Sequence, residues 1–250
     1  VAYGRDTAVL AASSDNDPDR ERVMVDAFTR RRVDGLILNT VTDDQGYLHA
    51  ERDQGTPLVF VDRPPNGLLA DAVITNNYEA AVEATQHLIN HGHRDIAHLG
   101  EEPATTTVRG RRRGFSDAMV QAGLAKTSHE VNGLRSEQEA YAAVHGLMQL
   151  DHAPTALFTS HHLVTLGTIR ALHDLQVQER VAMIGFDDLV LADLVHPAIT
   201  VMAQDPTRLG TLAAERIFAR LDGDTSAVLT TVVSAKLIAR GSGEIPPAAG

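Results

Sequence analysis

The sequence contains no cysteine and no tryptophan. Without cysteine the chain has neither disulfide bonds nor thiolate metal sites, which fits a cytoplasmic protein, and we expect that location. No apolar run approaches the roughly 20 residues that a membrane-spanning helix needs. The opening stretch, which includes Arg5 and Asp6, has no signal-peptide pattern. These absences predict a protein that does not insert into a membrane.

Basic residues are outnumbered as well. The chain has 22 Lys and Arg against 33 Asp and Glu, which gives a formal net charge of −11. A chain this acidic repels phosphate, so we expect it to be a poor nucleic-acid binder by itself. Apolar residues make up 43% of the 250 positions, enough to build the core of one large domain or of two lobes.

Short apolar runs alternate with amphipathic stretches along most of the chain. The runs predict strands, and the stretches between them predict helices. This alternation indicates an α/β fold with parallel sheets, and there are too many units for one small sheet, so we expect two doubly wound parallel-sheet lobes. The predicted strands are 6–13, 35–39, 57–61, 72–75, 95–100, 155–160 and 181–186, the predicted helices are 18–31, 78–90, 108–122, 136–150, 162–175 and 206–221, residues 227–240 are predicted to be extended, and the tail "GEIPPAAG" is predicted to be disordered.

Helix boundaries have local signals. Asp17 can cap the first long helix, and Pro18 suits its first turn. Val23, Ala27 and Phe28 supply an apolar stripe on that helix.

Polar residues follow nearly every predicted strand. Ligands of open α/β sheets bind outside the carboxyl ends of the strands. The pattern therefore predicts a hydrogen-bonding cleft between the lobes. The residues at these ends include Asn39, Asp62, Asn76, Asn77, Thr105, Arg111, His161, His162, Asp187 and Asp188.

Two groups raise the alternatives of catalysis and metal binding. Asp187 and Asp188 are adjacent, whereas a glycosidase pair needs carboxylates that face one bond from opposite sides. His87 and His91 have the i, i+4 spacing of a zinc helix, but no Glu stands beside His87 as in a metalloprotease helix. There is also no nucleophile elbow and no phosphate loop. We therefore expect no metal, no cofactor and no enzymatic activity.

Seven segments in order resemble the effector-binding core of the lactose/galactose-repressor family of bacterial transcription regulators, which is similar to periplasmic sugar-binding proteins. The resemblance extends from about Tyr3 to Ser242. The segments are "RRVDGLIL" (31–38), "TPLVFVDRP" (56–64), "HLINHGHRDIAHLG" (87–100), "RRRGFSDAMVQAGL" (111–124), "PTALF" (154–158), "IGFDD" (184–188) and "HPAITVMAQDPTRLGTLAAERI" (196–217).

The resemblance implies a type I periplasmic-binding-protein-like fold, with three crossings between two lobes and an interlobe ligand cleft. It implies an N-terminal lobe of residues 1–76 and 204–229, a C-terminal lobe of 77–203 and 230–243, and a tail of 244–250. Members of the family normally begin with a DNA-binding headpiece, which is absent from this sequence. The family's first core strand and helix also have no match, since Tyr3-Gly4 match the turn after that helix.

The resemblance also assigns ligand-binding residues. Asp187 matches the family's effector-binding aspartate, and a carboxylate accepts two hydroxyl hydrogen bonds at once. Arg111 matches its effector-binding arginine, and a planar guanidinium can bridge two ligand oxygens. Asp188 is expected to act as a cap, and Arg112 and Arg113 as solvated surface residues. Further matched cleft positions are Asn39, Asp62, Gln204, Thr105 and Thr107.

Two of the matched positions depart from the family. His161 stands where an asparagine commonly contacts the effector, and the imidazole can donate or accept in its place. The alternative for His161 is a surface helix cap. Arg135 stands where the family often has an aromatic residue, and this change could favour an anionic effector such as a sugar phosphate or sugar acid.

The implied function is effector binding and dimerisation in a transcriptional regulator, with DNA bound only through a headpiece outside this chain. A sugar-like ligand would shift the population between lobe arrangements. A homodimer is expected through the flanks of the chain. The helix 78–90 has Ala80, Ala81, Ala84 and Leu88 at helical spacing, and only part of that face is available, since some of it must cover its own sheet. The resemblance implies that the region after "GFDD" and the last strands complete the contact. The alternative function is that of a periplasmic sugar-binding protein of a transport system.

Overall fold

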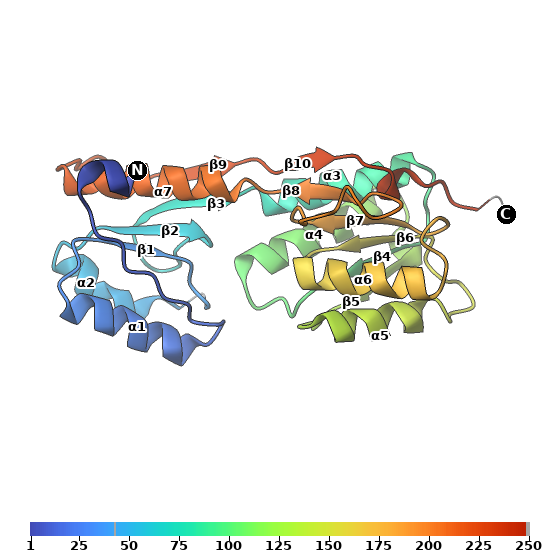
Figure 1. The fold of residues 1–250 in the computed structure, drawn as a ribbon, viewed down its shortest axis with the longest axis horizontal. Coiled ribbons are helices and arrows are strands. Elements are labelled where there is room, and N and C mark those ends of the chain that lie inside the picture. The colour runs from blue at the N-terminus through green and yellow to red at the C-terminus, as the bar shows by residue number, and fades with distance from the viewer. Residues whose placement is uncertain (43, 249–250) are drawn as a thin grey trace. The chain divides into compact units, whose positions relative to one another are not determined.

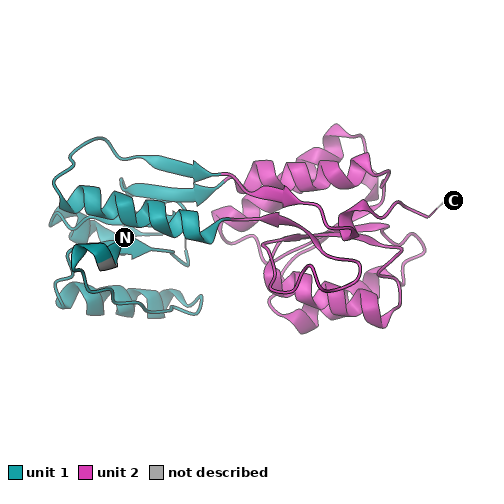
Figure 2. Ribbon diagram, turned by 45° about the horizontal axis from the view of Figure 1, so that its top comes forward, with its two compact units in different colours: residues 1–75, 205–233 teal, residues 76–204, 234–250 magenta. Residues whose placement is uncertain are grey.

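A computed structural model describes residues 1–42 and 44–248. The chain divides into two units, Val1–Thr75 with Asp205–Val233 (unit 1) and Asn76–Gln204 with Ser234–Gly250 (unit 2) (Figure 2). It passes between them three times. Gln204 belongs to unit 2, whereas the sequence places it in the first lobe, and the third crossing follows Val233 rather than a position near Thr230.

Unit 1 contains a parallel four-stranded sheet with helices on both faces (Figure 1). Leu58 and Phe60 pack in the cluster that includes Val25 of the first helix, whereas Val59 and Val73 pack against the last helix. The strands, in spatial order, are β1 (Leu36–Leu38), β2 (Leu58–Asp62), β3 (Asp71–Thr75) and β9 (Thr230–Val233), and the helices are α1 (Pro18–Arg30), α2 (His49–Asp53) and α7 (Pro206–Leu221).

Helix α1 begins as its sequence predicts but faces differently. The Asp17 carboxylate accepts hydrogen bonds from the backbone N–H groups of Asp19 and Arg20, at 2.9 and 3.1 Å. Val23 was expected in the apolar stripe but is 67% exposed, while Val25 is buried. The buried side of α1 also contains the Glu21 carboxylate, which accepts a hydrogen bond from the Val41 N–H at 2.6 Å. The buried side of α1 is therefore the one that contains Glu21 and Val25, four residues apart, and not the one that contains Val23.

The strand predicted over 6–13 is not formed. Residues 7–14 have no regular secondary structure, and Val9 and Leu10 are 71% and 50% exposed. An apolar run favours extended backbone, but a strand also needs a neighbour with which to share its ladder of hydrogen bonds. Within residues 1–42 and 44–248 this segment pairs with no strand.

Unit 2 contains a six-stranded sheet. All neighbouring strands are parallel except the pair β10–β8, which is antiparallel. The sequence did not predict β5, which is polar, or β8 as separate strands. The strands, in spatial order, are β10 (Lys236–Ile238), β8 (Thr200–Ala203), β7 (Ala182–Phe186), β6 (Ala156–Thr159), β4 (Ile96–Leu99) and β5 (Ser128–Val131), and the helices are α3 (Asn77–Asn90), α4 (Thr106–Gln121), α5 (Glu137–Leu147) and α6 (His162–Asp174).

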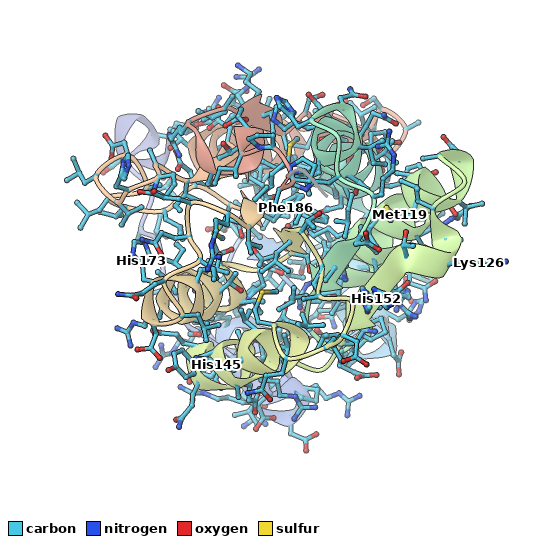
Figure 3. All side chains as sticks on the ribbon, turned by 90° about the vertical axis from the view of Figure 1, so that its right-hand side faces the viewer. Met119, Lys126, His145, His152, His173 and Phe186 are labelled. Atoms are coloured by element: carbon cyan, nitrogen blue, oxygen red, sulfur yellow. The ribbon has the colours of Figure 1, made fainter. Side chains whose placement is uncertain are left out.

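Alternate residues of these strands face two helical layers, as the period of two in a strand requires. Phe158 and Ile184 pack in the cluster under α3 and α4, whereas Leu157 and Met183 pack in the cluster under α5 and α6. In the end-on view of unit 2, Phe186 lies near the middle of the picture, with Met119 of α4 to its right and His145 of α5 below it to the left (Figure 3). The central strands are therefore buried on both faces.

The apolar face of α3 is buried within the chain. Ala80, Ala81, Ala84 and Leu88 are each 0% exposed and pack against the sheet of unit 2. These four side chains are therefore not available to a partner, and the expected contact keeps only its other parts, such as the region after "GFDD".

The last part of the chain contributes to both sheets. The predicted extended run 227–240 forms β9 in unit 1 and β10 in unit 2. The first part of the tail is ordered where disorder was expected. It contains a 3-10 turn over Ser242–Glu244, and the next residue, Ile245, packs on the core of unit 2. Residues 249–250 of the tail lie outside the described residues. Among the helices that the structure describes, none is long and apolar enough to cross a membrane.

Candidate functional site at the carboxyl edge of the unit 2 sheet

The carboxyl ends of β7, β6 and β4 lie side by side in unit 2. The chain reverses its direction of sheet building between β4 and β6, because β5 lies on one side of β4 and β6 on the other. Ligands of open α/β sheets bind outside the carboxyl ends of strands at such a switch point. This edge is therefore where the candidate site is expected.

Arg111 lies at this edge and is 6% exposed. Its Nε donates a hydrogen bond to Asn77 Oδ1 at 2.7 Å, and one Nη donates to the carbonyl oxygen of Ser160 at 2.8 Å. The guanidinium carbon lies 3.7 Å from the centre of the Phe186 ring, a cation–π contact. Three elements, α3, β6 and β7, thus fix one side chain of α4.

Close packing of α3 and α4 brings Arg111 to Asn77. A Cβ atom at Gly114 would lie only 2.4 Å from the carbonyl oxygen of Tyr78, so only glycine permits this approach. The sequence motif "RRRGF" therefore serves the site through its glycine as well as its first arginine.

Asp187 follows β7 directly and is half-buried. Its Oδ1 accepts a hydrogen bond from Gln204 Nε2 at 2.5 Å, and its backbone N–H donates to the carbonyl oxygen of Met202 at 3.0 Å. The amide of Gln204 thus orients the carboxylate. Because Phe186 precedes Asp187 and stacks under Arg111, the structure brings the two principal predicted residues to one place.

Asp188 is exposed and turns away to another partner. Its Oδ1 accepts a hydrogen bond from the Leu189 N–H at 3.0 Å within a loop that no helix follows, so this bond is not a helix cap. Both of its oxygens also pair with Arg240, and hydrogen bonding from Arg240 lowers the pKa of the Asp188 carboxyl.

His161 occupies the N-cap position of α6 without making a side-chain capping bond. Its Nδ1 is buried and has no hydrogen-bond partner. Burial lowers the pKa of the His161 imidazole; Glu101 and Asp187 act in the opposite direction, while His162 and Arg111 add to the lowering. The imidazole therefore lies within electrostatic reach of both predicted ligand-binding residues and is held in its neutral form.

Thr105 and Thr107 are buried at the start of α4. The Thr105 hydroxyl lies 3.1 Å from that of Thr107 and accepts a hydrogen bond from the Val108 N–H at 3.5 Å. These contacts build the helix terminus. Arg135, in contrast, is exposed, and its backbone N–H donates to the Glu139 carboxylate at 2.6 Å; no contact of its side chain with the site is seen.

Asn39 and Asp62 lie in unit 1, at the carboxyl ends of β1 and β2. Asn39 is exposed. Asp62 has a φ of 68°, and its carboxylate lies 3.9 Å from Arg63 Nε. Arg63 in turn donates a hydrogen bond to the carbonyl oxygen of Thr40 at 2.6 Å. The loops after these two strands are therefore linked to each other within unit 1.

The histidines of the "HLINHGH" segment serve structural roles in the described residues. His87 Nε2 lies 2.6 Å from the Glu244 carboxylate, and His91 Nδ1 lies 2.8 Å from the carbonyl oxygen of His87. His93 is buried between the Thr155 hydroxyl and the carbonyl oxygen of Ile245. Residues 1–42 and 44–248 contain no group of three or more His, Asp or Glu side chains arranged to hold a metal ion.

Sequence reasoning did not assign three residues that shape the site. Asn77 and Ser160 accept the hydrogen bonds of Arg111, and Phe186 supplies the ring beneath it. Asn77 was already expected among the polar residues that follow the strands, but without a contact to Arg111. Ser160 acts through its backbone and Phe186 reads as a core residue, so the sequence has no signal for either role.

Comparisons with known proteins agree with this architecture. Residues 85–243 match the model of the periplasmic binding protein-like domain. The transcriptional repressor PurR of Yersinia pestis bv. Antiqua is 29% identical over 245 residues, which are 96% of this chain and 72% of the relative.

Two solved structures have similar folds. A protein from Burkholderia thailandensis, named as a candidate ribose operon repressor, has a TM-score of 0.82 and 29% identity over 94% of this chain and 88% of its own. The Cra transcriptional dual regulator of Pseudomonas putida, solved in complex with fructose 1-phosphate, has a TM-score of 0.85 and 23% identity over 95% of this chain and 89% of its own. The chain therefore belongs to the periplasmic binding protein-like domain family, with the effector-binding core of lactose/galactose-repressor-type regulators.

Proposed function

We propose that this chain is the effector-binding part of a bacterial transcriptional regulator and that unit 2 binds a small sugar-like effector at the carboxyl edge of its sheet. The observation that carries the proposal is the placement of Arg111 over the ring of Phe186, the residue that Asp187 directly follows at the end of β7. A guanidinium and a carboxylate fixed at one strand edge can read donors and acceptors of one ligand together.

Asp187 would accept hydroxyl hydrogen bonds. Gln204 orients one carboxylate oxygen, and an ionised carboxylate has lone pairs for further donors on both oxygens. Arg111 would present a guanidinium that is already oriented by Asn77 and Ser160, so little side-chain entropy is lost on binding. His161 would add a donor or an acceptor through its ring.

Two classes of effector are open to this site. The carboxylates of Asp187 and Glu101 near His161 favour a neutral, hydroxyl-rich ligand, as the name of the Burkholderia relative suggests for its operon. The structure of the Pseudomonas regulator contains a sugar phosphate, which would need Arg111 and the exposed Arg135. A higher affinity for neutral ribose would indicate the first class, and a higher affinity for anionic fructose 1-phosphate would indicate the second.

The other matched residues are part of the proposal. Thr105 and Thr107 would act chiefly by shaping the start of α4, because their hydroxyls already contact each other. The resemblance also assigns Asn39 and Asp62 of unit 1 as ligand-binding residues, and this assignment stays a prediction. An effector that binds one conformation of the chain better than others would shift the population towards it, which is how a ligand signal would reach a DNA-binding headpiece.

The test is ligand binding by calorimetry and thermal shift, with ribose and fructose 1-phosphate as probes. Asp187→Asn and Arg111→Gln should each weaken binding at least tenfold, since losing a charge-assisted hydrogen bond costs about 1.5–3 kcal/mol. Asp151→Asn, an exposed carboxylate elsewhere in unit 2, is the matched control. Unchanged affinity in both site variants would overturn the site, and the absence of stabilisation by any monosaccharide or sugar phosphate would overturn the ligand class.

The transport alternative is less well supported, because the similar proteins carry the names of transcriptional repressors and regulators. The encoded residues that precede Val1 distinguish the two functions. A helix-turn-helix there supports the regulator, and a signal peptide supports transport. For the regulator, cytoplasmic location follows from its work on DNA.

We also propose that the chain forms a homodimer through the loop that follows β7. Val190, Leu191 and Leu194 are 92%, 60% and 72% exposed in this one loop. A cluster of exposed apolar side chains is typical of a protein contact surface. A two-fold contact places the same loop of both copies in register, so one patch is used twice.

A further inference from the structure

Asp187 has an unusual backbone conformation for a residue that carries a side chain. Its φ is 73°, in the left-handed region. A residue other than glycine typically loses about 1–2 kcal/mol there, so the surrounding structure must hold it in place. This conformation determines the direction of the Asp187 carboxylate relative to Phe186 and Arg111. Whatever holds the turn therefore also aims the carboxylate.

Hydrogen bonds from β8 account for one side of the turn. The Asp187 N–H donates to the carbonyl oxygen of Met202 at 3.0 Å, and Gln204 holds the carboxylate. The other side of the turn is Asp188, which is exposed and belongs to an otherwise open loop. A turn fixed on one side only would be free to relax towards a less strained φ.

Arg240 supplies the second side. One Nη donates to Asp188 Oδ1 at 2.7 Å and the other to Asp188 Oδ2 at 2.8 Å, which is a two-pronged arginine–carboxylate pair. The Arg240 side chain is 19% exposed, so solvent screens this pair less than an ordinary surface pair. Asp193 is a second acidic group near the guanidinium.

Arg240 is itself anchored to the sheet. Its backbone N–H donates to the Thr200 hydroxyl at 3.0 Å, and one Nη also donates to the carbonyl oxygen of Ile199 at 3.2 Å. Thr200 belongs to β8, as does Met202, which holds Asp187. Both sides of the turn are thus anchored to the same strand, β8.

We infer that Arg240 is a positioning residue for the effector site: it clamps Asp188 onto β8 and thereby keeps Asp187 in the left-handed conformation that directs its carboxylate. The inference rests on the proposed function, in which Asp187 binds the effector. A lysine would retain the charge but has no fork to engage both oxygens of Asp188. Arg240→Lys should therefore hold the turn less well than the natural arginine and better than Arg240→Ala.

The experiment measures the backbone of the turn directly. Backbone NMR of the full chain reports the conformation of Asp187 through its chemical shifts and its amide coupling, and hydrogen exchange reports the Asp187 and Leu189 amides. In Arg240→Ala the Asp187 signals should lose their left-handed character, and both amides should exchange about tenfold faster or more. Arg240→Lys should lie between this variant and the natural chain.

Arg170→Ala is the control, because Arg170 of α6 pairs with Glu137 of α5 at 2.6 Å within unit 2, and neither residue belongs to this turn. If Arg240 had only a structural role, Arg240→Ala would lower stability as a whole and leave the Asp187 conformation as it is. That result would overturn the inference. Should Arg240→Ala fail to fold, Asp188→Asn removes the same ion pair from the other side and gives the same readout.

Ligand binding gives the functional arm, with ribose and fructose 1-phosphate as probes. One of the two probes is expected to stabilise the natural chain. Arg240→Ala should weaken the binding of that probe about tenfold, although Arg240 itself is not proposed to contact it. If Asp187→Asn leaves that binding unchanged, the proposed function fails while the backbone result on Arg240 still stands. If Asp187→Asn weakens binding and Arg240→Ala does not, the positioning role fails alone.

Discussion

The guanidinium carbon of Arg111 lies 3.7 Å above the centre of the Phe186 ring, and both side chains are buried. The arginine comes from α4 and the phenylalanine from the last residue of β7. The contact places a cation over the ring of the residue that directly precedes Asp187. It also shields the guanidinium from water, so the hydrogen bonds of Arg111 to Asn77 and Ser160 count for more than they would at a surface.

Arg111→Lys should lower the free energy of unfolding of unit 2 by about 1–3 kcal/mol. An ammonium group has no planar fork to serve Asn77 Oδ1 and the Ser160 carbonyl oxygen together, so one buried acceptor loses its partner. Denaturant titration of both proteins measures the difference. Arg113→Lys, at a side chain that is 77% exposed, is the control and should have little effect.

Asp71→Asn should destabilise unit 1 by roughly 3 kcal/mol. Asp71 is 2% exposed and pairs with Arg220 Nε at 2.7 Å and Arg216 Nε at 2.9 Å. Its neutralisation deprives the partly buried Arg220 of this carboxylate and leaves Arg216 with Asp224 alone. Denaturant unfolding followed by a probe in unit 1 checks this. Loss no larger than for an exposed variant such as Asp53→Asn would contradict it.

The same residue predicts a loss of stability in acid. Burial by itself would raise the pKa of the Asp71 carboxyl, but hydrogen bonds from Arg220, the Leu229 N–H and Arg216 outweigh it and hold the pKa below its usual value. The stabilisation is therefore present above the ordinary pKa near 4 and is lost as the pH falls through the lower folded value. Asp71→Asn should remove this part of the pH profile.

His98→Leu should make the chain less sensitive to moderate acid. His98 is fully buried beside Phe115 and Phe158, neither ring nitrogen has a partner, and burial lowers its pKa to about 3, with Arg112 and Arg111 adding to the shift. The unfolded chain takes up a proton near pH 6.5 and the folded chain does not, so stability falls from there towards pH 3.

Between pH 7 and pH 5 this residue should account for a loss of about 2 kcal/mol, which the leucine variant should not show. Thermal unfolding across this range gives the comparison, and His93 remains in both proteins, so its contribution cancels. Parallel pH profiles for the two proteins would be incompatible with a neutral, buried His98.

Leu194→Asp should convert a dimer into a monomer. Leu194 is 72% exposed in the loop after β7, and a two-fold contact would bring the introduced carboxylates of both copies together in an apolar patch. Sedimentation at micromolar concentration measures the assembly. Val120→Asp, at an exposed valine of α4, is the control and should leave it unchanged. A natural chain that sediments as a monomer would refute the proposed contact.

The sequence by itself determined the features that depend on neighbouring residues. The alternation of apolar runs and amphipathic stretches predicted the α/β class and most strands, because strand and helix periods are local properties. Asp17 identified the start of α1, since a cap acts within its own turn. Polar residues after the strands pointed to Arg111 and Asp187, because the topology of a parallel sheet gathers carboxyl ends at one edge.

Only the tertiary structure decided which of these residues meet and which surfaces are used up. Residues 7–14 are apolar enough for a strand but have no partner strand in the described chain. The alanines of α3 are buried against the sheet of their own unit. The run 227–240 divides between two sheets because each half finds a different open edge. The pairing of Asp188 with Arg240 has no trace in the sequence, since contact across such a separation arises only when packing has placed both residues beside β8.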